Sequence, residues 1–209
     1  MKIIVLGGFL GSGKTTVLLQ FARYLITRSA GKTEIPVVIL ENEISEAGVD
    51  NQLLTQNDFT VENIFSGCIC CTSAAQMEDT IRLIEEKYHP EWLLIEATGM
   101  ASPNLIRQEL RADLNVNAAI LALADAKRWK RVLRAMPDFV KSQLHEASVI
   151  LVNKIDLVDE GELSEVCAQA AAYQPSALLC PVCALQPQED DFWEKTAAAL
   201  EHGMTEGQI

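Results

Sequence analysis

The sequence is short of positive charge. Its 17 Lys and Arg residues stand against 29 Asp and Glu residues, which gives a formal net charge of −12. Because contacts with nucleic-acid phosphates demand a basic surface, this balance argues against a nucleic-acid-binding protein. The chain has one basic cluster, formed by Lys127, Arg128, Lys130, Arg131 and Arg134. On a helix such a cluster is typical of a solvated face, with a docking patch for an acidic partner as the alternative.

The chain also lacks long hydrophobic runs, linkers and repeats. No stretch approaches the length of a membrane span, and glycines and Lys14 interrupt the apolar N-terminal run, unlike a signal peptide. No Gly/Ser-rich linker or internal repeat divides the 209 residues, of which 49% are hydrophobic. We therefore expect one domain over residues 1–209, in the cytoplasm. Six cysteines in a reducing compartment favour metal or redox chemistry over a disulfide framework.

Apolar segments alternate with helical segments, the pattern of an α/β domain with a mainly parallel sheet. Gly8, Glu41, Glu96 and Asn153 each follow an expected strand. In an open parallel sheet ligands bind beyond the carboxyl ends of the strands, so we expect these residues to converge at one edge. The long polar segment 41–57 favours a functional loop. The expected strands are 3–6, 37–40, 59–65, 92–95, 118–124, 149–152 and 178–182, and the expected helices include 14–29, 73–88 and 190–201.

Residues 8–15 read Gly-Phe-Leu-Gly-Ser-Gly-Lys-Thr, with the G-x-x-x-x-G-K-T spacing of a phosphate-binding loop between a strand and a helix. Glycines let successive N–H groups point at a phosphate, and the helix N-terminus adds a positive dipole. Lys14 would reach the β- and γ-phosphates, and the Thr15 hydroxyl would ligate Mg²⁺. The alternative is a glycine turn without a ligand. The predicted nucleotide contacts here are Gly8, Gly11, Ser12, Gly13, Lys14, Thr15 and Thr16.

Residues 153–156, Asn-Lys-Ile-Asp, form an N-K-x-D motif after a strand. The Asp156 carboxylate can accept from both guanine N1–H and the exocyclic amine, and adenine offers no such pair of donors. The motif therefore predicts GTP over ATP, although a plain turn after a strand is the alternative. The predicted contacts at the base are Asn153, Lys154 and Asp156, with backbone groups of Cys183 and Ala184 near guanine O6.

Carboxylates follow two other strands. Glu96 stands where phosphate-loop enzymes place the acidic residue that orients Mg²⁺, with a strand-end cap as the alternative. Gly99 would let the backbone approach the γ-phosphate and distinguish GTP from GDP. Glu41 and Glu46 could touch Mg²⁺, orient water or bind a second metal, whereas a solvated loop is the favoured explanation of Glu43 alone. The candidate catalytic residues are Lys14, Glu96 and Glu41.

Three thiols fall within four residues, at Cys68, Cys70 and Cys71. Thiolates suit Zn²⁺ or Cu⁺, and a tetrahedral site needs three or four ligands. We favour metal binding here over redox chemistry or packing, with a carboxylate from residues 41–46 as a further ligand.

The other cysteines and the histidines favour structural roles. Cys180 and Cys183 lie on a strand-like stretch, where their side chains would point to opposite faces, so core packing is favoured. Cys167 on a helical stretch is also expected in the core. His89, His145 and His202 belong to no cluster in the sequence, and we expect surface or structural roles for them.

With these motifs placed, the chain resembles the CobW family of metallochaperone-type phosphate-loop GTPases, whose relatives include HypB and UreG. The resemblance covers most of residues 1–185. It rests on the segments 8–16, 41–43 with 48–50, 67–72 (Gly-Cys-Ile-Cys-Cys-Thr), 96–99 with Ser102-Pro103, Asp125-Ala126 and 153–156.

The resemblance implies a three-layer α/β phosphate-loop fold and slow GTP hydrolysis with Mg²⁺. It further implies delivery of Zn²⁺ or Co²⁺ to a client metalloprotein or to a protein of the cobalamin pathway. Cys70 and Cys71, often with Cys68, and the carboxylates Glu41 and Glu46 are implicated in binding that metal. Related GTPases pair across the nucleotide face, which suggests a homodimer.

The sequence departs from the family pattern in two places. Family members commonly carry a further C-terminal domain, often with a His-rich stretch, and we expect this chain to be a short form without it. Ser66 stands where Asn is usual. Two other functions are alternatives: a zinc-binding adaptor that holds GTP without significant turnover, and a nucleotide-dependent small-molecule kinase. The N-K-x-D motif argues against the kinase.

Overall fold

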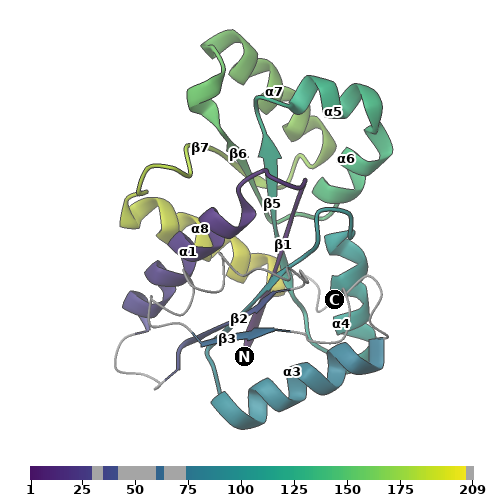
Figure 1. Cartoon of the computed structure of the whole chain (residues 1–209), viewed down its shortest axis with the longest axis vertical. Coiled ribbons are helices and arrows are strands. Elements are labelled where there is room, and N and C mark those ends of the chain that lie inside the picture. Colours follow the sequence, from purple (N-terminus) through teal and green to yellow (C-terminus); the bar gives the residue numbers. More distant parts are fainter. Residues whose placement is uncertain (30–34, 42–59, 64–73, 206–209) are drawn as a thin grey trace.

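The structure is a computed structural model that describes residues 1–29, 35–41, 60–63 and 74–205 (Figure 1). Its centre is one seven-stranded sheet in the order β3-β2-β4-β1-β5-β6-β7, with every neighbouring pair parallel. The strands are β1 (Lys2–Gly8), β2 (Val37–Glu41), β3 (Thr60–Asn63), β4 (Trp92–Glu96), β5 (Ala119–Asp125), β6 (Val149–Asn153) and β7 (Leu178–Val182).

Helices cover both faces of the sheet, which makes three layers (Figure 1). One face carries α1 (Lys14–Arg28) and α8 (Asp190–Thr205). The other carries α3 (Ala74–Tyr88), α4 (Pro103–Leu114), α5 (Trp129–Ala135), α6 (Pro137–Leu144) and α7 (Glu160–Tyr173). A short 3₁₀ helix, η1 (Ile155–Leu157), follows β6. The three-layer α/β fold predicted from the sequence is therefore confirmed.

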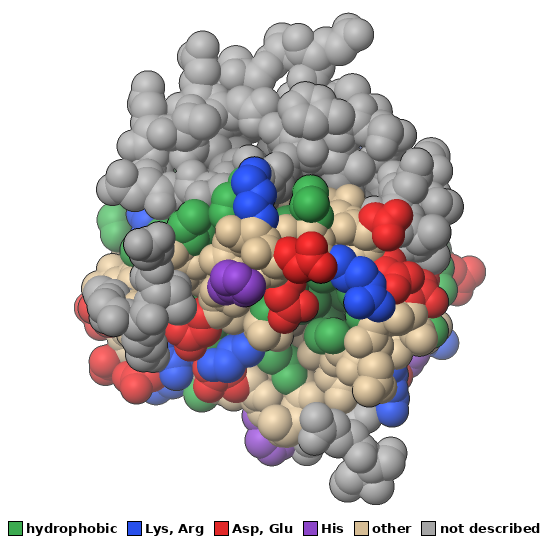
Figure 2. Space-filling model, turned by 90° about the horizontal axis from the view of Figure 1, so that it is seen from below, with side chains coloured by type: hydrophobic (Ala, Val, Ile, Leu, Met, Phe, Trp, Pro, Cys, Tyr) green, Lys and Arg blue, Asp and Glu red, His purple; other side chains and the backbone are tan. Residues whose placement is uncertain are grey.

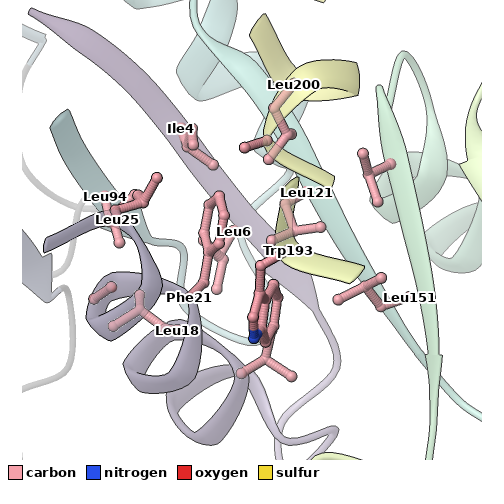
Figure 3. Packing of buried hydrophobic residues seen from close by; sticks show 14 of the residues in the cluster. Ile4, Leu6, Leu18, Phe21, Leu25, Leu94, Leu121, Leu151, Trp193 and Leu200 are labelled. Atoms are coloured by element: carbon pink, nitrogen blue, oxygen red, sulfur yellow. The ribbon is translucent and has the colours of Figure 1, made fainter. Parts of the chain in front are cut away.

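Burial on both faces explains why the strands read as continuous apolar runs. Along β1, Ile4 and Leu6 face α1 and α8, while Ile3 and Val5 face α3 and α4, and all four are fully buried. Figure 3 shows Phe21 of α1 and Trp193 of α8 together above the first of these faces, with ring centroids 5.3 Å apart. Each side chain of this size contributes roughly 2 to 3 kcal/mol by leaving water.

The predicted strands agree with the structure to within two residues at each end, apart from 59–65. Of that segment, 60–63 form β3 and the rest lies outside the described residues. The predicted closing helix 190–201 continues to Thr205. Pro137 stands in the first turn of α6 and separates it from α5, because proline fits a first helical turn but not a helix interior.

At the amino ends of the strands, ion pairs join β1 and α1 to α8. Lys2 at the start of β1 lies 2.8 Å from Glu201 of α8, and Arg28 of α1 lies 3.3 Å from the same carboxylate. Seen from this side, the described acidic and basic side chains are interspersed (Figure 2).

Among the described helices, none is both long and apolar enough to pass through a membrane.

Candidate functional site

The loop between β1 and α1 has the backbone that its glycines permit. Gly8, Gly11 and Gly13 have φ angles of 137°, 70° and 99°, a region that residues with a side chain rarely adopt. Gly13 is the last residue before α1, and a Cβ there would collide with the side-chain amide of Asn153. The glycines of the motif are therefore required by conformation and by close approach.

Lys14 points back into this loop. Its ammonium donates to the carbonyl oxygens of Gly8 and Phe9 at 3.2 and 3.4 Å, and only 6% of the residue is exposed. It also lies 3.9 Å from the carboxylate of Glu96 at the end of β4. The positive charge is thus held inside the loop, where the β- and γ-phosphates of a nucleotide would lie.

Thr15 and Glu96 bring oxygen atoms together at the same point. The Thr15 hydroxyl donates to both carboxylate oxygens of Glu96, at 3.2 and 3.3 Å. A hydroxyl and a carboxylate are the hard oxygen donors that Mg²⁺ prefers, so these two residues fit that ion. Glu41 is the backbone partner of Glu96 in the β2–β4 register, and its side chain lies outside the described part of the structure.

Three successive carbonyl groups of the loop accept hydrogen bonds from side chains of other elements. The Asn153 amide donates to Ser12 at 2.8 Å, the Lys154 ammonium donates to Gly11, and the Arg128 guanidinium donates to Leu10 at 2.7 Å. These bonds fix the carbonyl side of the loop, and the Ser12 N–H is used within it, donating to the Phe9 carbonyl at 3.0 Å.

Asp125, the last residue of β5, orients two of these donors. Its carboxylate accepts from the Arg128 guanidinium at 2.7 Å and from the Lys154 ammonium at 2.8 Å. Burial raises the pKa of Asp125, but the hydrogen bonds from Lys154 and Arg128 outweigh it and leave this pKa below its ordinary value. Arg128 therefore contacts the phosphate loop as well as solvent, with 40% of its side chain exposed, so a solvated face describes it only in part.

The rest of the basic cluster agrees with the prediction of a solvated face. Lys127, Lys130, Arg131 and Arg134 are exposed, and Lys130 pairs with Glu165 at 2.8 Å.

Residues 153–156, which are predicted to read the base and are called the base-reading motif below, are joined to the loop after β7. The Asn153 side-chain oxygen accepts from the backbone N–H of Ala184 at 2.9 Å, and the Cys183 thiol lies 3.3 Å from the Asp156 carboxylate. Gln20 of α1 donates to the Ala184 carbonyl at 2.7 Å. Sequence reasoning expected Cys183 in the core. It is buried, but it follows the end of β7 and contacts the carboxylate predicted to read guanine.

A groove of about 610 Å³ runs from the phosphate loop to this loop after β7, a volume within the range of ligand pockets. Thr15 and Thr16 line one end, Ala184 and Leu185 lie beside them, and the groove continues between α1 and the start of α8. Of the predicted nucleotide contacts, Thr15, Thr16 and Ala184 line this groove.

The other predicted positions divide into two groups. Cys180 and Cys167 are partly buried against core clusters, as expected, and burial raises the pKa of both thiols. Cys68, Cys70, Cys71 and Glu46 lie outside the described residues. Within the described part of the chain, no group of three or more His, Cys, Asp or Glu side chains is placed to hold a metal.

Sequence reasoning missed Gln143, a residue of α6 that contacts two loops of the site. Its side-chain oxygen accepts from the Gly8 N–H, and its side-chain nitrogen donates to the Ala101 carbonyl, both at 2.7 Å. Arg128 was missed as a site residue for the same reason: no spacing rule connects either side chain to the residues that it contacts. The unusual signal at Gln143 is an amide between Val140 and Leu144 on the buried face of a helix.

Comparison with known proteins identifies the family of the chain. Residues 2–180 match the family described as CobW/HypB/UreG, nucleotide-binding domain. The zinc chaperone YjiA of Escherichia coli is 30% identical over 188 residues, which are 83% of this chain and 57% of YjiA. The zinc-regulated GTPase metalloprotein activator 1 of Dictyostelium discoideum is 23% identical over 220 residues, covering 86% of this chain and 45% of that protein.

Solved structures agree on the fold. HypB from Archaeoglobus fulgidus matches with a TM-score of 0.68 at 17% identity, covering 95% of this chain and 89% of HypB. HypB from Helicobacter pylori, solved in complex with nickel, matches with a TM-score of 0.65 at 19% identity, covering 98% and 89%. The chain spans about half the length of the curated relatives it matches. By the match over residues 2–180, the chain belongs to the CobW/HypB/UreG family.

Proposed function

We propose that this protein binds and hydrolyses GTP and couples its nucleotide state to the binding of a transition metal, Zn²⁺ or Co²⁺, for delivery to a client protein. The observation that carries the GTP assignment is the hydrogen bond from Asn153 to the carbonyl of Ser12. It joins the base-reading motif to the phosphate loop, so the residues proposed to bind the two ends of the nucleotide are in direct contact. Specificity for guanine would come from Asp156.

The phosphate end has the groups that hydrolysis requires. Lys14 would stabilise negative charge that develops on the γ-phosphate, and the backbone N–H groups of residues 13–16 would surround the phosphates. Thr15 and Glu96 would hold Mg²⁺, which when bound neutralises phosphate charge. Gly99 lies against Leu10, since a Cβ on Gly99 would stand 2.8 Å from the Leu10 nitrogen. The Gly99 backbone would therefore lie beside the phosphate loop, where a γ-phosphate is expected.

Support for a metal cargo comes from the residue types and from the names of the relatives. Four relatives are named zinc chaperones, and one HypB structure was solved in complex with nickel. Cys68, Cys70 and Cys71 supply thiolates, and Glu41 and Glu46 supply carboxylates, a mixed set that suits Zn²⁺ or Co²⁺. A metalloprotein or a protein of cobalamin metabolism would receive the metal.

The arrangement of strands offers a route between the two ligands. Glu41 and Glu96 are neighbours in register at the carboxyl ends of β2 and β4. Glu41 would bind the transported metal and Glu96 would bind Mg²⁺. Binding of Mg²⁺ and nucleotide would therefore change the position of residues 41–46. By linkage, GTP would change metal affinity and metal would change GTP affinity by the same factor.

Metal titrations test this function. The purified protein is titrated with Zn²⁺ and Co²⁺ in the presence of GDP or of a non-hydrolysable GTP analogue, and we expect affinities that differ by about fivefold or more. Equal affinities in the two nucleotide states would remove the coupling.

Phosphate release separates the enzyme from a zinc-binding adaptor. Release should be measurable in the native protein and absent in Lys14→Ala.

A further inference from the structure

Gln143 is a buried amide placed between two loops of the nucleotide site. It lies on α6 with 2% of its surface exposed, and both ends of its side chain are used. The oxygen accepts from the N–H of Gly8, the first residue of the phosphate motif. The nitrogen donates to the carbonyl of Ala101, in the loop that connects β4 to α4. Each distance is 2.7 Å, so the amide forms two short bonds in a buried setting.

The loop from β4 to α4 is fixed at both ends against β1. At its start, the N–H of Ala97 donates to the Leu6 carbonyl at 3.0 Å. At its end, Ala101 is bonded to Gln143, and the ring of Pro103 packs so closely on Gly7 that a Cβ at Gly7 would collide with it. Residues 98–100 form the segment between these attachments, and this segment contains Gly99.

We infer that Gln143 is a positioning residue for recognition of the γ-phosphate. This inference rests on the proposed binding of GTP. Gly8 begins the loop that surrounds the β-phosphate, and Ala101 follows the Gly99 backbone that would meet the γ-phosphate. By bonding to both, Gln143 sets the distance between the phosphate loop and the loop after β4, and the γ-phosphate would lie between these two loops. An apolar side chain of the same size would fill the volume, but it would leave both backbone groups without these partners.

Comparing the affinities for GDP and for a GTP analogue distinguishes this role of Gln143 from a general structural role. GDP contacts the phosphate loop but has no γ-phosphate for the loop after β4. Loss of the Gln143 bonds should therefore weaken a non-hydrolysable GTP analogue more than it weakens GDP. A purely structural defect in the phosphate loop would weaken both nucleotides alike.

Two substitutions carry the test. Gln143→Met keeps the approximate volume and removes both bonds. Gln143→Glu keeps an acceptor for the Gly8 N–H and removes the donor to Ala101. For Gln143→Glu we expect Mg²⁺-dependent affinity for the GTP analogue to fall about fivefold to tenfold, the effect of losing one buried hydrogen bond, with GDP affinity changed less than about twofold. Gln143→Met also loses the bond to Gly8, so both affinities should fall, that for the GTP analogue by the larger factor. Isothermal titration at matched Mg²⁺ concentrations measures both affinities.

Lys141→Ala, an exposed position on the same helix, is the matched control and should bind both nucleotides like the native protein. If Gln143→Met does not fold, as judged by circular dichroism, Gln143→Glu decides the question. Equal losses for the two nucleotides, or no loss in a folded variant, would overturn the role of Gln143. If instead the native protein binds neither GTP nor GDP, the proposed function itself fails, so the two failures are distinguishable.

Discussion

The carboxylate of Asp125 lies 2.8 Å from the ammonium of Lys154, where the neighbouring strands β5 and β6 end. The same carboxylate binds Arg128, and the two cations bind the carbonyls of Gly11 and Leu10. The buried Asp125 therefore orients Lys154 and Arg128, two of the three side chains that donate to carbonyl groups of the phosphate loop. Lys154 is recognisable from its motif, but its position depends on a residue of another strand.

Asp125→Asn should weaken GTP and GDP together. The substitution keeps the shape of the side chain and removes the charge that holds Lys154 and Arg128, so the phosphate loop common to both nucleotides loses support. We expect both affinities to fall about tenfold, the effect of losing one charge-assisted hydrogen bond. Isothermal titration measures this. Lys127→Ala, an exposed neighbour, is the control, and selective loss of GTP alone would contradict the expectation.

The Asp125 cluster should also contribute a pH-dependent part of the stability. Because the native pKa of Asp125 lies below its ordinary value, ionisation stabilises the fold above the unfolded-state pKa, about 3.9. That contribution is lost as the pH falls through the native pKa. Urea denaturation of the native protein and of Asp125→Asn should give a constant difference above about pH 5 that narrows below about pH 4. A difference that stays constant down to pH 3 would argue against this assignment.

Gly13→Ala should damage both the loop and the base-reading motif. The φ of 99° is strained for alanine, and the added Cβ would displace the Asn153 amide from Ser12. We expect a loss of roughly 1 to 3 kcal/mol in the free energy of unfolding and little remaining affinity for nucleotides. Gly161→Ala in the first turn of α7 is the control, and it should change neither quantity by much. Unaltered GTP binding in Gly13→Ala would contradict the close approach.

Asp156→Asn should change the base that the protein prefers. The carboxylate would accept from two guanine donors, whereas an amide offers one acceptor and one donor. Xanthine has a carbonyl where guanine has its exocyclic amine, so it matches the amide. We expect GTP affinity to fall by a factor of about 100, the loss of a pair of charge-assisted bonds, and xanthosine triphosphate to bind more tightly than GTP. Competition between the two nucleotides measures the change. Continued preference for GTP would exclude Asp156 as the base reader.

Replacing Cys70 and Cys71 by alanine should separate metal binding from nucleotide binding. Two thiolate ligands are lost, and we expect Zn²⁺ and Co²⁺ affinities to fall by at least about 100-fold. GTP affinity in the absence of metal should change less than about twofold, because the described contacts of the phosphate loop involve neither cysteine. Cys167→Ala on α7 is the control. Native-like metal binding by the double variant would show that the cysteine site is wrongly assigned.

Much of the fold could be predicted because its causes are local. The strands are apolar on both faces, so short runs such as residues 92–95 are visible in the sequence. The glycines of the phosphate loop and the residues 153–156 carry fixed spacings. By contrast, Gln143 and Arg128 act through contacts with residues more than 40 and 100 positions earlier in the chain. Their partners are set by the packing of α5 and α6 on the sheet, and no spacing in the sequence records that packing.

The ion pair between Lys2 and Glu201 places the beginning of β1 beside the last turns of α8, at the amino ends of the strands. A reporter or partner domain fused at either position would leave the molecule on the side away from Lys14. The seven residues of β1 separate the two sides, a span of about 23 Å at about 3.3 Å per residue. Fusions with linkers shorter than this span would therefore keep the added domain away from the phosphate loop.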